Sequence, residues 1–466
     1  MEQFNLLLGD INGFIYGKFL IVVLLGIGIY FTVRTRAVQL RMIPEGIKVI
    51  SEKAKDKDSM SSFEALMIST ASRVGTGNIA GVATAIVAGG VGAVVWMWII
   101  AIVGAASAFV ESTLAQVYKE KDGKIFKGGP AYYIEKAMHA RWLGVLFAIS
   151  LILTYAFGFN GLQAQTIASS FEVFVPDFHD SMAPMIIGFV LAACAGVAFF
   201  GGTKMISKIT STLVPIMAIV YILLGLIIFI ANIAELPEVL GKMFAAAFDF
   251  EAIFGGFAGS CVVAGIKRGL FFNEAGMGSA PNAAAAADVS HPAKQGLVQV
   301  LSVFIDTLII CSSTAFTVMM TSDSIVETGL DGAPLVQAGF ETLFGSAGLI
   351  IFTFAMCLFA FTSVIGNYFY AEANIKFISD NKMLMKAFRV LAVLMVFIGA
   401  QYSLATAWNI ADVLMGVMTT INCVAMLFLG NIAIKVLKDY EEQKKAGLDP
   451  TFSAKKLGIK NTDWWN

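Results

Sequence analysis

Long apolar segments alternate with short polar ones along almost the whole chain. A helix needs about 20 predominantly apolar residues to cross the hydrocarbon core of a bilayer. Eleven segments are of about this length, at 14–33, 63–88, 91–118, 141–170, 182–200, 206–231, 251–285, 296–320, 345–374, 387–407 and 409–436. The pattern predicts an all-α polytopic membrane protein with eleven spans.

Polar and small residues interrupt the second segment. Arg73 is followed by Gly75-Thr76-Gly77-Asn78 in the middle of the predicted span. Gly weakens a helix by roughly 1 kcal/mol relative to Ala, and a charge at mid-bilayer costs at least about 2.5 kcal/mol. Non-helical backbone is tolerated at this depth where protein buries it or where it lines a wet cavity. We therefore expect a helix break at 75–78 that faces a binding cavity. The alternative is close packing of helices on small residues.

The same arrangement occurs a second time. Arg73 and Asn78 with a following Ala-Gly pair recur, at identical spacing, as Arg268 and Asn273. Two further matches in the same order are 109–111 with 304–306, and 160–165 with 367–372. Paired, polar-interrupted segments in two halves of a chain point to the binding site of a transporter.

Lys and Arg gather in alternate loops. The loop after the first span holds seven of them between residues 34 and 57, whereas the intervening loops are acidic. Basic loops stay in the cytoplasm, so we expect a multi-pass protein of the cell membrane with its N-terminus outside and its C-terminus inside. Segments 63–88 and 251–285 then cross in opposite directions, as an inverted repeat requires.

This topology divides the chain into four parts. They are an N-terminal transmembrane helix with a basic cytoplasmic loop at 1–62, a five-helix repeat at 63–231, an inverted five-helix repeat at 251–436 and a cytoplasmic tail at 437–466. The tail is charged and is expected to be flexible. Its Trp464 and Trp465 are candidates for contact with the membrane surface.

Composition narrows the function. Hydrophobic residues make up 58% of the chain and the mean hydropathy is +0.78, against about 45–50% apolar residues in soluble domains. A net charge of −1 argues against a nucleic-acid partner. The five cysteines lack metal-ligand spacing, and we find no zinc-protease, triad or phosphate-loop motif. An enzyme is not expected, and a channel or a receptor-like binding protein are the other rivals to a transporter.

Three stretches carry a family resemblance. They read GGVGAVVWMWIIAIVG at 89–104, KRGLFFNEAGMGSAP at 267–281 and GTGNIAG at 75–81. Together they resemble the alanine or glycine:cation symporter family over about residues 14–436, with one departure at Val95, where that pattern has Phe. The resemblance implies a LeuT-like 5+5 inverted-repeat fold with one additional N-terminal helix. It also implies sodium-coupled uptake of small neutral amino acids such as alanine and glycine, by alternating access.

The interrupted helix suggests how a zwitterion could bind. A site at bilayer depth must satisfy both charges of a free amino acid. The second half of a broken helix begins with unpaired N–H groups and the positive end of its dipole. We therefore assign the carboxylate to the amides near Gly75, Thr76 and Gly77, with the side chain of Thr76 or Asn78 as a further donor.

Other polar groups could complete this substrate site. Carbonyls around Ile266 and Gly269 are expected to accept from the ammonium group. Gln163 and Gln165 are additional candidates, and their alternative role is a hydrogen bond between helices.

The cation site follows from the resemblance. By analogy with the LeuT-like fold, sodium is bound by the carbonyls of Ala71 and Val74 and by the hydroxyls of Thr362 and Ser363. Unwound carbonyls supply such oxygen ligands in transporters. The alternative for the two hydroxyls is a bond back to their own helix.

One residue leaves the substrate open. The family usually has Trp after the glycine that corresponds to Gly366, and this chain has Asn367. An Asn that faces the pocket would make it larger and more polar, so that serine-type or glutamine-type substrates become an alternative to alanine and glycine.

The intramembrane charges need partners. We expect Arg73 and Arg268 to form gate or structural ion pairs with nearby acids, which are Glu111, Glu274, Asp306 and Glu372. A proton-coupled carrier is the nearest rival to sodium coupling, and Glu111 or Glu274 would then titrate during transport. The partners are thus a small neutral amino acid, a sodium ion and the lipid bilayer, and we expect a monomer.

Overall fold

The computed structural model describes residues 2–54, 59–123, 125–249, 251, 253, 256, 260–320 and 329–465. Seven helices in this part of the chain are long and apolar enough to cross a membrane, and they are Gln3–Arg34, Ala93–Val117, Arg141–Phe174, Ala183–Ala231, Pro292–Met320, Gly332–Ile378 and Leu404–Lys445. The prediction of an all-α polytopic membrane protein is confirmed. The other predicted spans fall on described helices that are shorter, broken or more charged, and the first part of the span at 251–285 lies mostly outside the described residues, so the number eleven stays a prediction.

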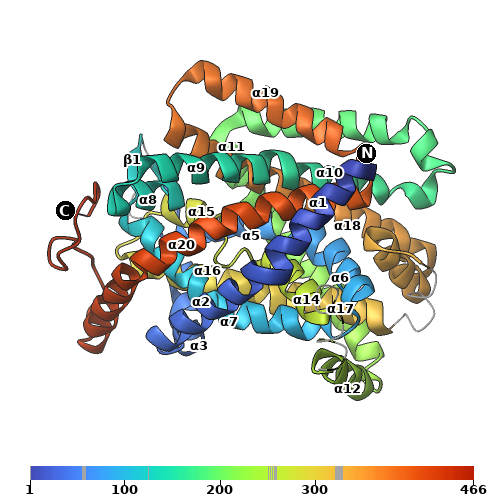
Figure 1. The fold of residues 1–466 in the computed structure, drawn as a ribbon, viewed down its shortest axis with the longest axis horizontal. Coiled ribbons are helices and arrows are strands. Elements are labelled where there is room, and N and C mark those ends of the chain that lie inside the picture. The colour runs from blue at the N-terminus through green and yellow to red at the C-terminus, as the bar shows by residue number, and fades with distance from the viewer. Residues whose placement is uncertain are drawn as a thin grey trace.

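The helices and strands are numbered in the order in which they occur along the chain (Figure 1). Those of the first half are α1 (Glu2–Ile15), η1 (Tyr16–Leu20), α2 (Ile21–Arg34), α3 (Val38–Arg41), α4 (Ile43–Ile50), α5 (Ser62–Arg73), η2 (Gly77–Gly81), α6 (Val82–Gly89), α7 (Ala93–Val117), β1 (Glu120–Asp122), β2 (Ile125–Lys127), α8 (Pro130–Met138), α9 (Arg141–Ile152), η3 (Leu153–Phe159), α10 (Asn160–Ser169), η4 (Glu172–Phe174), η5 (Phe178–Asp180) and α11 (Ala183–Ala231). Strands β1 and β2 form an antiparallel hairpin.

The second half is also helical. Its elements are α12 (Leu236–Ala247), α14 (Cys261–Asn273), α15 (Pro281–Ala286), α16 (Pro292–Phe304), η7 (Ile305–Cys311), α17 (Ser312–Met320), α18 (Gly332–Ile378), α19 (Lys382–Gly399) and α20 (Leu404–Lys445).

Glycines explain two differences from the predicted spans. The segments 182–200 and 206–231 lie in one helix, α11, but Gly202 between them has φ 77° and bends it. Gly345 (φ 64°) bends α18 in the same way, so that helix begins at Gly332 rather than near residue 345. The predicted span at 387–407 is wrong at its end, because α19 stops at Gly399 and α20 begins at Leu404.

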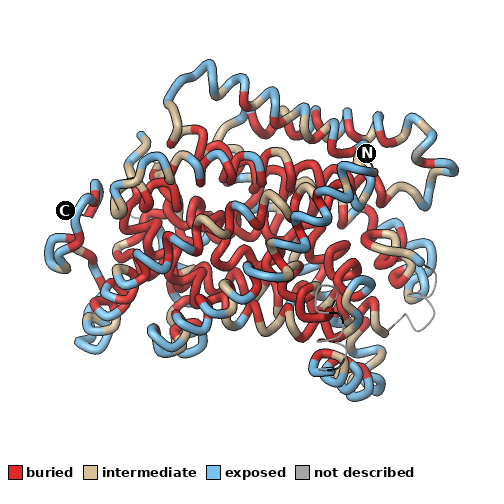
Figure 2. The backbone as a smooth tube through the Cα atoms, viewed as in Figure 1, coloured by how far each residue is buried: buried red, intermediate tan, exposed pale blue. Residues whose placement is uncertain are grey.

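The core of the molecule surrounds α7. This helix packs against α2, α14 and α16, and buried residues concentrate in the same central region (Figure 2). Helix α1 packs on α20, although the two are almost 400 residues apart, and α12 and α19 lie at opposite edges of the bundle (Figure 1). Large apolar side chains stay exposed on the outer helices, for example Phe189 and Leu391, as expected of a surface that faces lipid.

The C-terminal tail is ordered, so the expectation of a flexible tail is wrong. Helix α20 continues to Lys445, and the chain then folds back against the end of the molecule that carries α8 and the β1–β2 hairpin. Trp465 is buried, and its Nε1 donates to the carbonyl oxygen of Gln116 at 2.7 Å. Trp465 therefore contacts protein instead of the membrane surface, because its apolar ring and its N–H both find partners there.

A buried histidine ties α20 to the start of α16. His291 Nδ1 accepts from the Ala293 amide, and its Nε2 lies 3.2 Å from Asp439 Oδ2. Burial lowers the pKa of His291 to about 4, although the Asp439 carboxylate opposes this shift. The ring is therefore neutral near pH 7, with its proton on Nε2 and directed at Asp439.

We expect Trp465→Ala to release the tail. Loss of a buried Trp side chain costs roughly 3–5 kcal/mol, enough to raise the undocked fraction about 100- to 4,000-fold. Limited trypsin digestion should then cut faster after Lys455, Lys456 and Lys460. The matched control is Trp464→Ala, whose side chain is 40% exposed and which should have a smaller effect. Equal digestion of Trp465→Ala and the unchanged protein would contradict the docking.

Candidate functional site

The chain breaks in the middle of the second predicted span. Helix α5 ends at Arg73, Val74 has φ −78° and ψ 85°, and helical structure resumes at Gly77. The break at 74–76 thus begins one residue before the predicted 75–78. Side chains satisfy the freed amides, since Gly75 N donates to Asn78 Oδ1 (3.2 Å) and Thr76 N donates to Gln163 Oε1 (3.1 Å).

Gly75 is wedged between two helices that hold the break. A Cβ at this position would overlap the hydroxyl of Ser363 on α18 and would lie 3.0 Å from Gln163 Oε1 on α10. Only glycine leaves room for both neighbours. The unwound backbone is therefore enclosed by polar atoms of α10 and α18, in the buried interior of the helix bundle.

Three of the four predicted cation ligands come together at this break. Ser363 Oγ donates to the carbonyl oxygen of Ala71 (2.8 Å) and lies 3.4 Å from that of Val74. Oxygen atoms of this kind bind hard cations. Thr362 follows the alternative stated above, since its hydroxyl donates to Phe359 O of its own helix (2.9 Å).

The two predicted side-chain donors differ in their surroundings. Asn78 Nδ2 donates to Asp306 Oδ1 (2.5 Å), and Thr314 Oγ1 donates to the carbonyl of Asn78 (2.7 Å). These bonds tie the break to η7 and α17. Thr76 Oγ1, by contrast, is buried with no hydrogen-bond partner among the described residues, and it is the more available of the two.

Asn367 joins three helices. Its Nδ2 donates to Asn160 Oδ1 on α10 (3.0 Å), and its Oδ1 lies 2.8 Å from Ser72 Oγ on α5. The same Ser72 oxygen lies 2.8 Å from Glu274 Oε1. The side chain is fully buried, so it takes part in the network beside the break as well as occupying the position where the resembling family has Trp.

A second break follows α14. Glu274, Gly276 and Gly278 all have positive φ (53°, 83° and 88°) before α15 begins at Pro281. The Gly276 and Gly278 amides donate to the two oxygens of Glu111 (3.1 and 3.0 Å), which also accepts from Asn422 Nδ2 (2.8 Å). A carboxylate of α7 thus satisfies the backbone that this break exposes.

The position of the second break corrects one prediction. Ile266 and Gly269 lie inside α14, where backbone carbonyls accept within the helix, so they are not free to bind an ammonium group. Gln165 is also separated from the first break. Its Oε1 accepts from Thr166 Oγ1 (3.5 Å), and residues two apart on a helix, such as Gln163 and Gln165, do not face the same way.

Buried ion pairs flank both breaks. Arg73 Nε lies 3.8 Å from Glu274 Oε2, and both side chains are almost completely buried. Arg268 does not pair with any of the four predicted acids. Its guanidinium instead meets Asp412 at 2.9 and 3.4 Å and lies 3.7 Å from the Trp408 ring. Asp412 was missed because it is far from α14 in sequence and lies in a predicted span with no matching repeat.

An aromatic wall lies beside the first break. The Phe271 ring centroid is 4.6 Å from that of Phe159 and 5.0 Å from that of Trp408, and a Cβ on Gly77 would lie 2.6 Å from Phe271 Cε1. The sequence analysis overlooked these rings. The one available signal was the position of Phe271 within the repeated motif at 267–281.

Comparisons with known proteins match this chain to one family of transporters over almost its whole length. The profile of the sodium:alanine symporter family matches residues 1–454. The chain is 46% identical to the amino-acid carrier protein AlsT of Bacillus subtilis, covering 100% of this chain and 98% of that protein. It is 44% identical to the probable sodium/glutamine symporter GlnT of the same organism (96% and 92%). It is 38% identical to a sodium/proton-dependent alanine carrier protein of Bacillus sp. PS3 (90% and 96%).

We expect Glu274→Gln to destabilise the protein strongly. Removing one partner of a buried ion pair leaves the other charge uncompensated, which costs about 3–5 kcal/mol. Arg73→Met combined with Glu274→Gln should recover much of this loss, because both charges are then absent. Thermal denaturation of the purified protein measures the effect, and exposed Glu238→Gln is the control, since surface pairs contribute about 0–1 kcal/mol. A double variant that is no more stable than Glu274→Gln would contradict the pairing.

Proposed function

We propose how this chain, which belongs to the sodium:alanine symporter family, carries out transport. A small neutral amino acid and a sodium ion bind together at the first helix break and cross the membrane together. The chain is a multi-pass amino-acid:sodium symporter, and its relatives are transporters rather than enzymes. The observation that carries the proposal is the unwound backbone at 74–76, enclosed by Ser363 and Gln163. Irregular backbone at membrane depth is tolerated only where protein buries it or a cavity needs it.

Sodium is proposed to bind between α5 and α18. The carbonyls of Ala71 and Val74 already converge on Ser363 Oγ, and a cation would replace the hydroxyl proton as their partner. The hydroxyl oxygen of Ser363 is the third proposed ligand. That of Thr362 is the fourth, because the hydroxyl donates its proton to Phe359 O and keeps its oxygen lone pairs for a cation. All four residues are buried, so a bound ion would exchange its hydration shell for protein oxygens.

The amino acid is proposed to lie against the other side of the same backbone. Its carboxylate is assigned to the amides of Gly75, Thr76 and Gly77 and to the unpartnered Thr76 hydroxyl. The half-helix that begins at η2 directs the positive end of its dipole at this point. Gln163 Oε1, which now accepts from Thr76 N, would be released to accept from the ammonium group. Phe271 and Phe159 would enclose the aliphatic part.

Ion pairs on either side of the site are proposed as gates. Arg73 with Glu274 and Arg268 with Asp412 each link two helices that meet at a break. Alternate breaking of these pairs would open the site to one side of the membrane at a time. As part of this mechanism we propose a LeuT-like inverted repeat, a monomer and an N-terminus outside the cell. The two termini lie toward opposite ends of the long axis in Figure 1, which supports their placement on opposite sides of the membrane.

Proton coupling is the alternative that one relative favours. The Bacillus sp. protein is named a sodium/proton-dependent alanine carrier, and this chain buries the carboxyl groups of Glu111 and Glu274. Both groups have structural partners, since Glu111 accepts from three donors and Glu274 faces Arg73. These partners favour a structural role for the two acids, and therefore sodium as the coupling ion.

The substrate is proposed to be alanine or glycine, with glutamine-type or serine-type amino acids as the alternative. GlnT, one of the similar proteins, is named a probable sodium/glutamine symporter. A pocket that places Asn367 where Trp is usual would admit a longer and more polar side chain.

We expect Ser363→Ala to raise the sodium concentration for half-maximal uptake. Loss of one oxygen ligand, with the net value of a single hydrogen bond, corresponds to roughly a 2- to 10-fold increase. Uptake of labelled alanine into proteoliposomes at graded sodium concentrations measures it. Ser346→Ala is the matched control, because Ser346 lies on the same helix but is exposed. An unchanged sodium dependence in Ser363→Ala would remove Ser363 from the cation site.

We expect Asn367→Trp to exclude larger substrates and to spare glycine, because the indole would fill the space beside Ser72 and Asn160. Competition of unlabelled glycine, alanine, serine and glutamine against labelled glycine measures the change. Asn160→Ala serves as the control, since it removes the partner of Asn367 without adding volume. Equal loss of every substrate in Asn367→Trp would assign Asn367 a purely structural role.

A further inference from the structure

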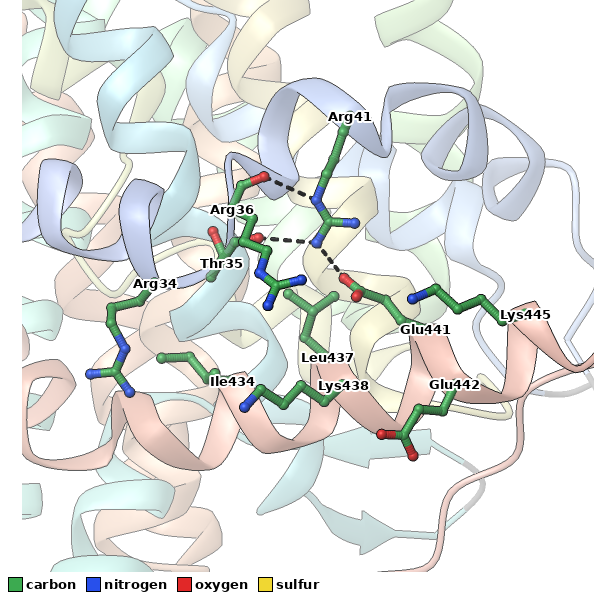
Figure 3. A pocket seen from close by; sticks show the side chains of 10 residues that line it. All are labelled: Arg34, Thr35, Arg36, Arg41, Ile434, Leu437, Lys438, Glu441, Glu442 and Lys445. Carbon is green, nitrogen blue, oxygen red and sulfur yellow. Dashed lines mark hydrogen bonds and ion pairs between the residues drawn. The ribbon is translucent and has the colours of Figure 1, made fainter.

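A basic cavity lies far from the helix breaks, between the turn after α2 and the last turns of α20 (Figure 3). Its volume is about 300 Å³. Five cationic side chains line it against two carboxylates, and these residues are Arg34, Arg36, Arg41, Lys438, Lys445, Glu441 and Glu442. Two apolar side chains, Ile434 and Leu437, complete the lining on α20.

Most of this positive charge has no anionic partner. Arg41 pairs with Glu441. Arg34 bonds only neutral groups, the Tyr30 hydroxyl and Asn431 Oδ1. Arg36, Lys438 and Lys445 make no ion pair with any described residue. Basic residues at helix C-termini are common because they complement the helix dipole, but that effect does not require four cations without an ion pair around one cavity, where they repel each other.

The turn that carries Arg36 is strained and held in place. Arg36 and Ala37 both adopt left-handed backbone conformations (φ 55° and 53°), which cost non-glycine residues roughly 1–2 kcal/mol each. The Arg41 guanidinium donates to the carbonyl oxygens of Arg36 and Thr35, both at 3.0 Å. One arginine therefore fixes the turn, and Figure 3 shows the Arg36 guanidinium between that turn and α20. Strain of this kind clusters at binding sites.

The cavity begins where the lipid-facing surface ends. Val33, next to Arg34, is 69% exposed, and Phe428 on α20 is 70% exposed. The hydrogen bond from Arg34 to Asn431 joins the first polar positions beyond these two apolar residues. A lipid whose acyl chains lie along α2 and α20 would thus present its headgroup to the cavity.

We propose that this cavity binds the phosphate headgroup of an anionic phospholipid. Arg36, Lys438 and Lys445 supply the positive charge, Arg34 supplies a guanidinium fork suited to phosphate oxygens, and the neighbouring apolar surface binds the acyl chains. Basic pockets between transmembrane helices bind anionic headgroups in this way. A free phosphate ion offers the same charge but not the chains, so affinity that depends on the chains distinguishes the two sources.

The test uses native mass spectrometry of the purified full-length protein, titrated with phosphatidylglycerol, with phosphatidylcholine and with inorganic phosphate. Arg36→Gln combined with Lys438→Gln should weaken phosphatidylglycerol binding roughly 10- to 30-fold. The control combines Lys435→Gln with Lys460→Gln. It removes equal charge from exposed positions outside the cavity and should leave the binding unchanged. Glu442→Gln removes a negative charge from the lining and should strengthen the binding several-fold.

Three results would overturn the proposal. They are equal loss in the cavity and control variants, equal binding of inorganic phosphate and phosphatidylglycerol, and unchanged affinity in Glu442→Gln. The melting temperature of each variant in phosphatidylcholine micelles reports whether it is folded. If the double variant is unfolded, Lys438→Gln alone and Glu442→Gln still decide the question, because both change exposed side chains.

Discussion

Unpaired backbone amides inside a membrane must find partners, and the arrangement of this molecule depends on how the two helix breaks meet that requirement. Water is absent from the bilayer core, and each unsatisfied group there costs several kcal/mol. At the first break the partners are neutral side chains, Asn78 and Gln163. At the second break the partner is a carboxylate, Glu111. Substrate groups can displace neutral amides more readily than a buried charge, which is why we place transport at the first break and a structural role at the second.

The site is built by helices that are distant in sequence. Ser363 on α18 and Gln163 on α10 touch Gly75 from two sides, and Asn367 and Ser72 continue the network toward Glu274. A change in any one of these contacts therefore affects the packing of at least three helices, α5, α10 and α18. Such a network can hold two discrete arrangements, because packed polar contacts rearrange as units instead of deforming gradually. This property is what alternating access needs, and it links the break to the ion pairs of Arg73 and Arg268.

Sequence reasoning reached the features that are local. Apolar length identified the membrane helices, and the run of small and polar residues at 75–78 located the first break to within one residue. It failed where contacts are long-range. Asp412 pairs with Arg268 although the two are 144 positions apart in the sequence, and the hydrophobic periodicity of a chain does not predict such a pair. The carbonyls around Ile266 and Gly269 were predicted to be free, but both residues lie inside α14, and the backbone departs from the helix only at the positive φ angles of Glu274, Gly276 and Gly278. The tail resembled a disordered segment in composition, yet it docks on the protein through several long-range contacts, among them the hydrogen bond from Trp465 to Gln116 and the bond from Asn461 to Lys136.

Uptake of labelled alanine into proteoliposomes, with the sodium gradient and the proton gradient imposed separately, tests the central claim most directly. Our account predicts that an inward sodium gradient alone drives accumulation, because the oxygen atoms gathered at Ala71, Val74 and Ser363 suit a sodium ion and the buried acids are already partnered. Accumulation driven only by the proton gradient would contradict it and would transfer the coupling role to a carboxyl group such as Glu111 or Glu274.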